Sequence, residues 1–456
     1  MAEYYKERSQ PTRTKADVII VGAGPVGLLT ALGLAHAGVD VLVIEAHHEL
    51  LPTTRAMVYM PVILPVLKEL GILDIVTEHA FLNKEGVKWR NLDGEVLAHL
   101  PLGSNDSKEF GGVLLIGQWR MNELILRELQ KYPNVHVQFG RRCVGVQDDP
   151  SSNIVKVMTH SGSLLDDETF LEAKYVVATD GANSAVRRMS CIPFEGFTFQ
   201  EFKMIGTDVI YDFIGQEGLS PLNFIVHDKH WAVIAYTGQD EGRLPPGSGK
   251  PQWRVAYVED PHLPAGKDDY LKRAQERVKT YIKKGDGQFK VIRAEPYLMQ
   301  QRVAAQPRKG RVLLAGDSLH SNNPIGGLGL TGGILDAFCY SNALKRVLVG
   351  GAHESLLTTC ALARRNAWRG ITNKLSQDNM IRLYSMKPKD VRDREEFFRK
   401  LNDPKTRKLV AGAVRASFDT MMLEDFKSSF EASLLMPSDK SSTTTEDVES
   451  TSQPRL

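Results

Sequence analysis

The sequence predicts an α/β fold in which a doubly wound nucleotide-binding unit is interleaved with a β-rich unit and followed by a helical C-terminal region. Three observations support this prediction: a strand–turn–helix with closely spaced glycines near the N-terminus, apolar β-type runs between residues 202 and 258, and helical patterning from Ser355 to Leu435. With 456 residues, of which 42% are hydrophobic and 25% charged, the chain has the composition of a globular protein. Its length suits two to three domains.

The N-terminal unit opens with the apolar strand 17–20, which leads into a glycine-rich turn. The glycines have the spacing G-x-G-x-x-G and are Gly22, Gly24 and Gly27. In this motif the first glycine permits a tight turn, the second lets a pyrophosphate approach the backbone, and the third lets helix and strand pack closely. The helix predicted over 28–37 then points its free N–H groups toward the phosphates.

A carboxylate follows at the position expected for a ribose contact. The second strand, 39–44, ends at Glu45, which lies 23 residues after Gly22. An acid at this distance hydrogen-bonds ribose hydroxyls in dinucleotide-binding folds. The strand, turn, helix and acid together predict a Rossmann-like site for an ADP-ribose group, which FAD and NAD share.

The following segments alternate between strands and helices. We expect a hairpin within 86–100, a helix over 121–130, and strands over 135–139 and within 144–178. The β-rich unit is predicted to contain strands over 204–213, 223–226, 231–237 and 253–258. A helix over 268–283, a buried strand over 311–315 and a helix over 333–348 come next, and the Ser/Thr-rich segment 437–456 is predicted to be disordered.

Two further motifs place acidic side chains directly after buried strands. In the first, a strand ends at Asp180, and Arg187 follows. In the second, a strand ends at Asp317, and the chain continues through Pro324 into a glycine-rich turn that opens a helix containing Asp336. Doubly wound folds bind ligands at the carboxyl ends of their strands. A glycine-rich turn at a helix N-terminus suits an anion or a ring that becomes anionic.

In this order and spacing, the three motifs resemble those of single-component (group A) FAD-dependent aromatic monooxygenases, the para-hydroxybenzoate hydroxylase-like family. The resemblance covers about residues 16 to 380. The overall pattern is similar to fungal enzymes of secondary metabolism that act on phenolic or polyketide-like compounds. The resemblance implies non-covalent FAD, NADPH or NADH as a transient co-substrate, and transfer of one oxygen atom from O2 to an aromatic ring through a C4a-hydroperoxyflavin.

Other activities on the same scaffold stay open. The runner-up is an epoxidation, an oxidative dearomatisation or a ring expansion, because the flavin chemistry is shared and the substrate decides the outcome. An FAD oxidase or reductase without oxygen insertion, and a flavin-binding protein without catalysis, are the alternatives of other classes.

The resemblance also implies which residues contact the cofactor. Gly22, Gly24 and Gly27 would hold the FAD pyrophosphate, and Glu45 the adenosine ribose. Arg55 and Arg120 would lie near the middle of the cofactor, with Gln118 as the rival of Arg120. Asp317 would bind ribityl or ribose hydroxyls, and the backbone N–H groups of Gly329 and Leu330 would contact the pyrimidine edge of the flavin.

Two positions carry alternatives. Asp180 and Arg187 belong to a motif that serves both FAD and the nicotinamide cofactor in the family, and a purely structural pair is the other interpretation. The family usually has asparagine after the residue that matches Leu330, whereas this chain has Thr331. The backbone contacts are expected to survive this departure, and a side-chain contribution at Thr331 stays open.

The resemblance divides the chain into interleaved domains. The FAD-binding domain is predicted to comprise 16–85, 110–190 and 290–350, and the substrate domain 86–109 and 191–289. C-terminal helices over 351–436 complete the prediction. Arg364, Arg365 and Arg369 in these helices are expected on a solvated or interdomain face, and a monomer and a homodimer are both compatible with the sequence.

A phenol reacts fastest as its phenolate, so a base or proton relay is expected on the β-rich segment 202–258. Tyr236 would hold a substrate hydroxyl, and Arg254 would bind a carboxylate or a phenolate. Further candidates are Tyr211, His227 and His230. A packed tyrosine, an ion-paired arginine and surface histidines explain the same residues equally well.

The substrate is predicted to be a larger or less acidic aromatic compound than para-hydroxybenzoate. A loose alignment places Ile225, Ala235 and Thr237 where the benzoate-specific relatives keep polar substrate contacts. An apolar pocket of this kind favours a small aromatic natural product, for example a phenol without a carboxylate or a bicyclic intermediate.

The net charge of the chain and the sequences of its two ends predict which partners it lacks and where it is located. The 57 basic and 55 acidic residues give a net charge of +2, so nucleic acid and membrane surfaces are not expected partners. The chain contains no long apolar run, and its N-terminus lacks a signal-peptide pattern. We therefore expect a cytoplasmic protein, with a peroxisomal address at Pro454–Leu456 as the alternative.

The cysteines show no metal-ligand spacing and are expected to be buried thiols in a reducing compartment. They are Cys143, Cys191, Cys339 and Cys360.

Overall fold

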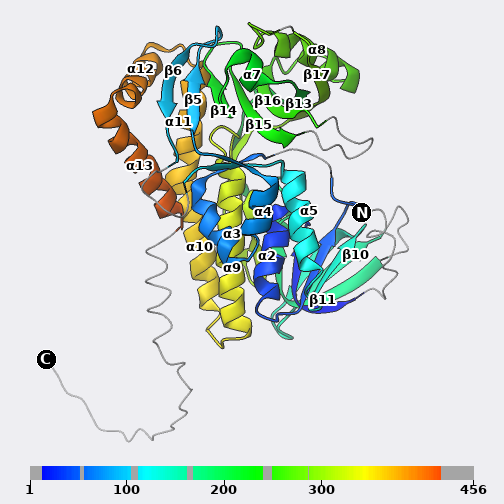
Figure 1. Cartoon of the computed structure of the whole chain (residues 1–456). Coiled ribbons are helices and arrows are strands. Elements are labelled where there is room, and N and C mark those ends of the chain that lie inside the picture. The colour runs from blue at the N-terminus through cyan, green and yellow to red at the C-terminus, as the bar shows by residue number, and fades with distance from the viewer. Residues whose placement is uncertain are drawn as a thin grey trace, which may run out of the picture.

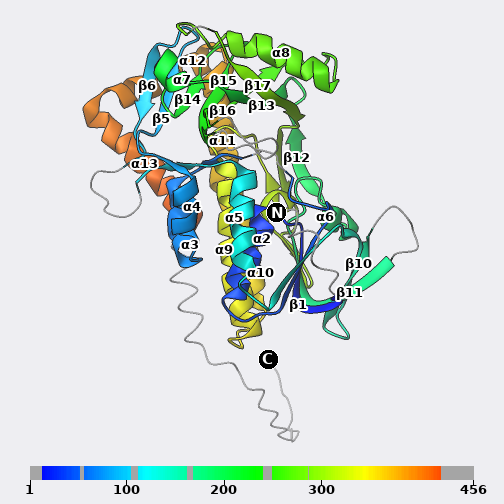
Figure 2. The same ribbon diagram turned by 45° about the vertical axis from the view of Figure 1, so that its right-hand side comes forward.

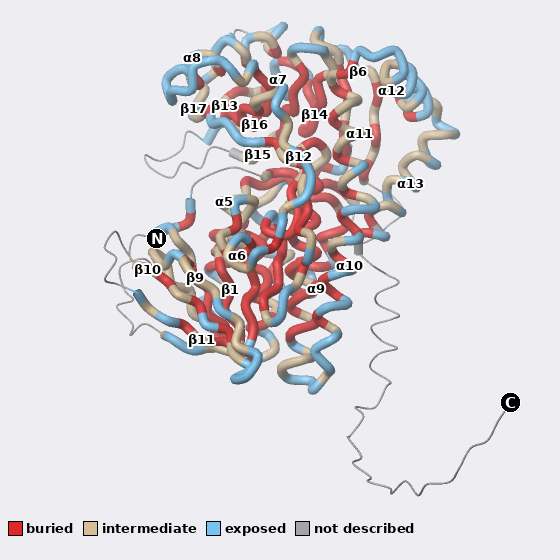
Figure 3. The backbone as a smooth tube through the Cα atoms, turned by 180° about the vertical axis from the view of Figure 1, so that it is seen from behind, coloured by how far each residue is buried: buried red, intermediate tan, exposed pale blue. Residues whose placement is uncertain are grey.

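The computed structural model describes residues 13–51, 56–103, 111–161, 168–239, 249–285 and 287–422. Two sheet-based units lie one above the other in Figure 1, and the C-terminal helices extend along both. The predicted α/β class is confirmed, since a largely parallel sheet with helices stands beside an antiparallel sheet. Buried residues concentrate along the strands of both sheets and along α9 (Figure 3).

The lower unit is built on an eight-stranded sheet, and we call it the eight-stranded unit. Its central strands run parallel and are almost fully buried, as the continuous Val/Ile/Leu runs predict. The strands are β1 (Lys15–Val21), β2 (Val41–Glu45), β8 (Val135–Phe139), β9 (Arg142–Asp149), β10 (Ile154–His160), β11 (Glu168–Ala178), β19 (Arg308–Lys309) and β20 (Val312–Leu314).

Three helices of this unit lie side by side in Figures 1 and 2: α2 (Pro25–Ala35), α5 (Gln118–Leu129) and α9 (Leu328–Leu348). Helix α9 begins at Leu328, before the predicted 333. Its glycines stay helical because they permit close packing: a Cβ added at Gly333 would lie 2.7 Å from Val26 Cγ2. Shorter helices complete the unit: η1 (Pro61–Ile63), α3 (Leu64–Glu69), α4 (Leu73–His79), α6 (Ala185–Met189) and η2 (Gly316–Ser318).

The upper unit is a seven-stranded sheet with helices on its outer face, and we call it the seven-stranded unit. The predicted hairpin within 86–100 pairs β5 with β6 at one edge. The strands are β5 (Val87–Arg90), β6 (Val96–Leu100), β13 (Lys203–Ile210), β14 (Leu222–Ile225), β15 (Ala232–Gln239), β16 (Pro251–Glu259) and β17 (Lys290–Tyr297), and the helices are α7 (Phe213–Glu217) and α8 (Lys267–Lys279).

The domain limits predicted from the sequence need one adjustment. The segment 290–297 was assigned to the FAD-binding domain, but β17 pairs with β13 and so belongs to the seven-stranded sheet. The chain therefore returns to the eight-stranded unit only after β17. Two three-stranded sheets connect the units: β3 (Val58–Tyr59), β7 (Val113–Leu115) and β4 (Phe81–Asn83), and β12 (Phe194–Thr198), β18 (Gln300–Ala304) and β21 (His320–Ser321).

The C-terminal helices pass from the eight-stranded unit to the seven-stranded unit and back. Helix α10 packs along α9, and α12 packs on β6 before α13 returns to α9 and α10. Their bounds are α10 (Ser355–Ala367), the π-helix η3 (Trp368–Thr372), α11 (Asn373–Tyr384), α12 (Pro388–Asn402) and α13 (Pro404–Met422). The predicted helical residues 423–435 and the tail 437–456, with its terminal tripeptide, lie outside the described residues.

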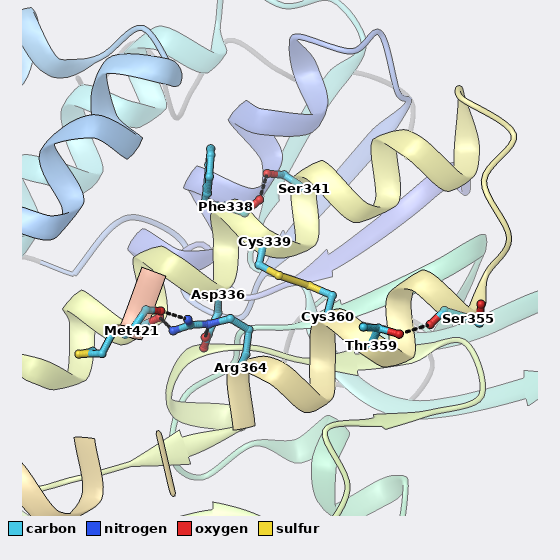
Figure 4. Close-up of a disulfide and its surroundings, with 10 residues drawn as sticks. Asp336, Phe338, Cys339, Ser341, Ser355, Thr359, Cys360, Arg364 and Met421 are labelled. Atoms are coloured by element: carbon cyan, nitrogen blue, oxygen red, sulfur yellow. Dashed lines mark hydrogen bonds and ion pairs between the residues drawn. A yellow bond between two sulfur atoms is a disulfide. The ribbon is translucent and has the colours of Figure 1, made fainter. Parts of the chain in front are cut away.

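The expectation of four buried thiols is wrong for three of the cysteines. Cys143 is buried, and burial raises the pKa of its thiol to about 12. Cys191 is exposed because it follows the short helix α6 in a left-handed conformation, with φ 54°. Cys339 and Cys360 form a disulfide, because the packing of α9 against α10 brings their Cα atoms to 6.4 Å (Figure 4).

None of the described helices is both long enough and apolar enough to span a lipid bilayer.

Candidate active site

The first glycine-rich turn is shaped by close backbone contacts and leaves room beside its middle glycine. Gly22 has φ +107°, and a Cβ added at Gly27 would lie 2.1 Å from the Gly22 carbonyl oxygen. A Cβ added at Gly24 would meet no atom within 4 Å. No side chain of a described residue caps α2, so the first N–H groups of this helix have no side-chain acceptor there. The turn therefore fits a pyrophosphate.

Glu45 holds the same turn through backbone hydrogen bonds. Its carboxylate accepts from the Ala23 N–H and the His47 N–H, each at 2.9 Å. Each oxygen has a second lone pair, which can accept from a ribose hydroxyl. The structure thus places Glu45 beside the turn, and its contact with a ribose stays a prediction.

Asp180 and Arg187 both support the loops that follow the central strands. No salt bridge joins them within the described residues, although the charge of Asp180 acts on Arg187. Asp180 Oδ2 accepts from the Ala185 N–H at 2.7 Å, while its Oδ1 is buried and has no protein partner. Arg187 donates to the Ser318 carbonyl oxygen at 2.8 Å and lies over the Phe194 ring. Both side chains thus have structural contacts within the fold, and a role of either one toward a cofactor stays a prediction. The orphaned Asp180 oxygen is an acceptor that a bound cofactor would satisfy.

Asp317 projects from a segment that is otherwise buried. It is the one exposed residue between Val312 and Ser321, all of which the structure describes. The next residue is fixed from two sides: Ser318 Oγ donates to the Ala178 carbonyl oxygen at 2.6 Å, and its own carbonyl accepts from Arg187. A rigid loop that presents one carboxylate at a strand end suits a hydroxyl-rich ligand such as a ribityl chain.

The second glycine-rich turn gives α9 an N-terminus without a side-chain cap. Gly326 and Gly327 have φ of +108° and +65°, and Gly327 is the N-cap residue. Gly329 and Leu330 follow in the first helical turn and are half-buried. Their N–H groups have no partner within α9, since first-turn N–H groups never do. This arrangement fits an acceptor edge of a flavin ring, and the contact itself stays a prediction.

The threonine that replaces the usual asparagine fastens this turn to β3. Thr331 Oγ1 donates to the Gly327 carbonyl oxygen at 2.7 Å and accepts from the Met60 N–H at 3.4 Å. The side chain at this position therefore has a local structural role.

The two candidates on α5 differ in their contacts. Gln118 Oε1 accepts from the Ala56 N–H at 3.2 Å, beside the position of Arg55 in the chain. Arg120 instead donates to Glu123 at 2.7 Å and contacts His79 Nδ1 at 3.2 Å. Arg55 lies outside the described residues. Which of these side chains contacts a cofactor stays open.

Tyr236 of β15 is half-buried and packs against both of the cores that flank the seven-stranded sheet. Its ring packs edge-on against Phe81 of β4, with ring centroids 5.3 Å apart, and against Trp253 at 5.4 Å. Burial, and then the negative charge of Asp212, raises the pKa of the Tyr236 hydroxyl. The group therefore stays protonated at neutral pH and can donate a hydrogen bond to a phenolate.

The other candidates have structural partners. Arg254 is buried and pairs with Asp208 at 3.0 Å, and Asp208 also binds Arg293 at 2.6 Å. Tyr211 donates to the buried Glu217 at 2.7 Å.

The two histidines lie at the turn between β14 and β15. His227 Nδ1 accepts from the backbone N–H groups of Lys229 and His230, at 3.1 and 3.0 Å. The His230 ring contacts Arg277, and burial together with that charge lowers the pKa of His230. These contacts favour structural roles for Arg254, Tyr211, His227 and His230.

One face of the seven-stranded sheet is an apolar wall. Its residues share a single buried core with Ile325 and Leu328 of the second glycine-rich turn. They are Met204, Leu222, Phe224, Val233, Ala235, Ala256 and Val258. The opposite face packs under α7 and α8 in a separate core that contains Ile225. Of the positions compared with benzoate-specific relatives, Ala235 lies in the wall, and the Thr237 hydroxyl donates to the Gln252 carbonyl at 3.0 Å.

The sequence reasoning missed a buried ionic cluster behind the Asp317 loop. Asp336 of α9 binds Arg364 of α10 at 2.6 Å and lies 2.8 Å from His320. Arg364 is only 2% exposed, so the expectation of a solvated or interdomain face is wrong for this residue. Arg365 is half-buried and Arg369 is exposed. An acid in the middle of the otherwise apolar run from Gly332 to Tyr340 was the available signal.

Comparison with known proteins relates most of the chain to FAD-binding proteins. The sequence pattern of a family described as "FAD binding domain" matches residues 15–374. Para-nitrophenol 4-monooxygenase of Pseudomonas sp. (strain WBC-3) is 34% identical over 366 residues, which cover 79% of this chain and 86% of that protein. The 6-hydroxy-3-succinoylpyridine 3-monooxygenase HspB of Pseudomonas putida (strain DSM 28022 / S16) is 34% identical over 376 residues, covering 82% and 90%.

A solved structure gives the same result in three dimensions. The crystal structure of p-nitrophenol 4-monooxygenase PnpA from Pseudomonas putida DLL-E4 matches with a TM-score of 0.80 and 31% identity. The match covers 90% of this chain and 99% of that chain.

Proposed function

The chain belongs to the family whose FAD binding domain matches residues 15–374, and from this premise we propose that it is an FAD-dependent, NAD(P)H-driven monooxygenase acting on aromatic substrates. It inserts one oxygen atom from O2 into a phenolic or related ring. Relatives at 34% identity are monooxygenases of para-nitrophenol and of a hydroxypyridine, which supports an aromatic substrate. A role in fungal secondary metabolism and a cytoplasmic location stay predictions, and both relatives come from Pseudomonas.

The observation that carries this proposal is that the apolar wall and the second glycine-rich turn border the same small sheet. Strand β15 of the wall contacts β4 and β7, and α9, which the turn opens, contacts β3 of that sheet. A ring held against the wall would therefore lie on the side of the sheet that faces the segment proposed for the flavin edge. Bound FAD supplies the chemistry by accepting hydride from NAD(P)H and activating O2.

The residues of the chain position the reactants and exclude water. The first turn, with Gly24, would hold the pyrophosphate, and Asp317 would hold the ribityl or ribose hydroxyls. The uncapped N-terminus of α9 would stabilise negative charge on the flavin ring, because its N–H groups carry partial positive charge. The wall keeps water away from the reacting ring. Tyr236 donates a hydrogen bond to the phenolate oxygen and so holds the substrate in its more reactive form.

The wall also favours substrates without a carboxylate. The buried Arg254 and the half-buried Arg293 of the seven-stranded sheet both engage Asp208. A carboxylate would compete with that aspartate for the same guanidinium groups. We therefore propose a neutral or weakly acidic phenol as the substrate class, with epoxidation, dearomatisation or ring expansion as the alternative outcome on the same scaffold.

The test is anaerobic mixing of the purified flavoprotein with NADPH or NADH, with the visible flavin band followed with and without a set of phenols. We expect bleaching that accelerates with 4-nitrophenol or an unsubstituted phenol and much less with 4-hydroxybenzoate. After oxygen is admitted, the product should gain the mass of one oxygen atom. No bleaching with either nicotinamide cofactor, despite bound FAD, would contradict the monooxygenase proposal and favour an oxidase.

A further inference from the structure

Asp336 is a fully buried carboxylate that joins three segments of the chain. Its Oδ2 accepts from the Gly316 N–H at 2.9 Å and lies 2.8 Å from His320 Nε2. Its Oδ1 accepts from Arg364 Nε at 2.6 Å. Burial by itself would raise the pKa of Asp336, but the charges of His320 and Arg364 outweigh it and hold the pKa at about 2. The carboxylate is therefore ionised at neutral pH and bonded on both oxygens.

On one side, Asp336 controls the loop that presents Asp317. Gly316 and His320 flank Asp317 in the chain, and both contact the same carboxylate oxygen. The imidazole of His320 is 2% exposed and stacks on Trp368, with an angle of 16° between the rings. Movement of Asp336 would release both ends of this loop at once.

On the other side, Arg364 carries the connection to the last described helix. Its guanidinium donates to the Met421 carbonyl oxygen at 2.5 Å and to the Gly332 carbonyl oxygen at 3.2 Å, besides the bond to Asp336. Figure 4 shows the Arg364 side chain reaching toward Asp336 and Met421, close to the disulfide between Cys339 and Cys360.

The end of α13 is anchored by burial as well. Phe418 and Met421 are 6% and 1% exposed, whereas Leu409 in the middle of the same helix is 73% exposed. Helix α13 contacts α9, α10 and η3, and the Met421 sulfur lies 4.0 Å from the Thr372 hydroxyl of η3. The Met421 carbonyl therefore reaches Arg364 only while the Phe418–Met421 segment is docked.

We propose that Asp336 and Arg364 are positioning residues for the FAD site, and that they couple the docking of the end of α13 to the conformation of the Gly316–His320 loop. The inference rests on the proposed function, because it takes this loop as part of the FAD site. It extends that site to α13, which lies beyond residue 374, where the family match ends. Neither positioning residue needs to touch the cofactor.

The experiment measures the FAD dissociation constant of the full-length apoprotein by quenching of flavin fluorescence. The variants are Met421→Ala, Asp336→Asn and their combination. We expect each single change to weaken FAD binding about tenfold, and the double variant to bind about as weakly as Asp336→Asn alone. Met421→Leu should rescue, because a side chain of similar volume keeps the helix end docked. Leu409→Ala is the matched control on the exposed face of α13 and should bind FAD as the wild type does.

A purely structural role predicts a different pattern. If the two effects multiply in the double variant, the segments act independently and the inference is wrong. The same follows if Met421→Ala binds FAD with wild-type affinity. The visible band of bound flavin adds a second readout: a band shift shared by Met421→Ala and Asp336→Asn supports a common displacement of the loop, and unrelated spectra contradict it.

Two safeguards keep the result decisive. If Asp336→Asn does not fold, Arg364→Lys takes its place, because it keeps a positive charge beside Asp336 but cannot also reach both carbonyl oxygens. If the wild-type protein binds no FAD, the proposed function fails. If the wild type binds FAD and all variants match it, only this inference fails.

Discussion

Asp336 in the eight-stranded unit and Asp208 in the seven-stranded unit are both buried beside two basic side chains, but they stabilise different things. Asp336 binds a backbone N–H as well as Arg364, and so fixes the course of a loop. Asp208 contacts Arg254 and Arg293 on the neighbouring strands β16 and β17, at 3.0 and 2.6 Å. The first carboxylate shapes a ligand site made of backbone groups. Asp208 neutralises arginine side chains within a sheet whose strands are already joined by backbone hydrogen bonds.

This difference shows that the two units bind their ligands through different kinds of groups. The cofactor side depends on glycine positions and helix ends, which bind any ligand of the right shape and polarity. The substrate side depends on side chains brought together from separate strands, which select one ring from another. Changes in the eight-stranded unit are therefore expected to abolish cofactor binding, and changes in the seven-stranded unit to affect stability or substrate handling.

The largest effect is expected at Gly27. A methyl group added there meets the Gly22 carbonyl oxygen at 2.1 Å, so Gly27→Ala should destabilise the apoprotein by about 3 kcal/mol and abolish FAD binding. Gly24→Ala is the matched control, because an added Cβ meets nothing within 4 Å. It should leave the unfolding free energy of the apoprotein within about 0.5 kcal/mol and still weaken FAD binding. Urea unfolding and flavin fluorescence measure the two quantities, and equal unfolding losses in both variants would contradict the packing argument.

The next effect is expected at Asp208. Asp208→Asn removes the negative charge that contacts the buried Arg254 and the half-buried Arg293, which should lower the free energy of unfolding by roughly 3–5 kcal/mol. FAD affinity should stay near that of the wild type. Glu195→Gln, which breaks the exposed pair with Arg369, is the control and should cost less than about 1 kcal/mol. A loss of FAD affinity in Asp208→Asn would break the comparison between the units.

A smaller and pH-dependent effect is expected at Glu217. Burial would raise its pKa, but hydrogen bonds from the Lys283, Lys284 and Gly285 N–H groups and from Tyr211 lower it. The folded-state pKa lies below the unfolded one, so the stabilisation is present above pH about 4.3 and is lost as the pH falls further. Glu217→Gln should therefore lower the free energy of unfolding by about 1–3 kcal/mol at pH 7. The difference in this free energy between the wild type and the variant should become smaller toward pH 3. Urea unfolding at several pH values measures it, and a pH-independent difference would refute the role of the charge.

The smallest effect in free energy is expected at Tyr236. Tyr236→Phe keeps the ring contacts with Phe81 and Trp253 and removes only the hydroxyl. FAD binding and the unfolding midpoint should stay unchanged, while product yield falls about tenfold, equivalent to roughly 1.4 kcal/mol, with the missing oxygen appearing as hydrogen peroxide. Product analysis together with a peroxide assay tests this, and a wild-type yield would remove Tyr236 from the mechanism.

The sequence by itself determined the α/β class, the glycine-rich turn at Gly22–Gly27, the acids at Glu45, Asp180 and Asp317, and the FAD family. These features can be predicted from the sequence because a tight turn, a positive φ or a helix N-terminus restricts which residues can occupy a few adjacent positions. The hairpin at 86–100 and the strand at 135–139 were predicted for the same reason, since their patterns are local.

Only the tertiary structure decided which distant side chains meet. Asp336 and Arg364 lie 28 residues apart, and Arg364 and Met421 lie 57 apart, so no local pattern revealed that they share one buried cluster. The same holds for Arg254, whose partner Asp208 comes from a neighbouring strand, and for Cys339 and Cys360, which helix packing joins. Burial changes the chemistry of the charged groups, because a charge removed from water must find a partner within the fold.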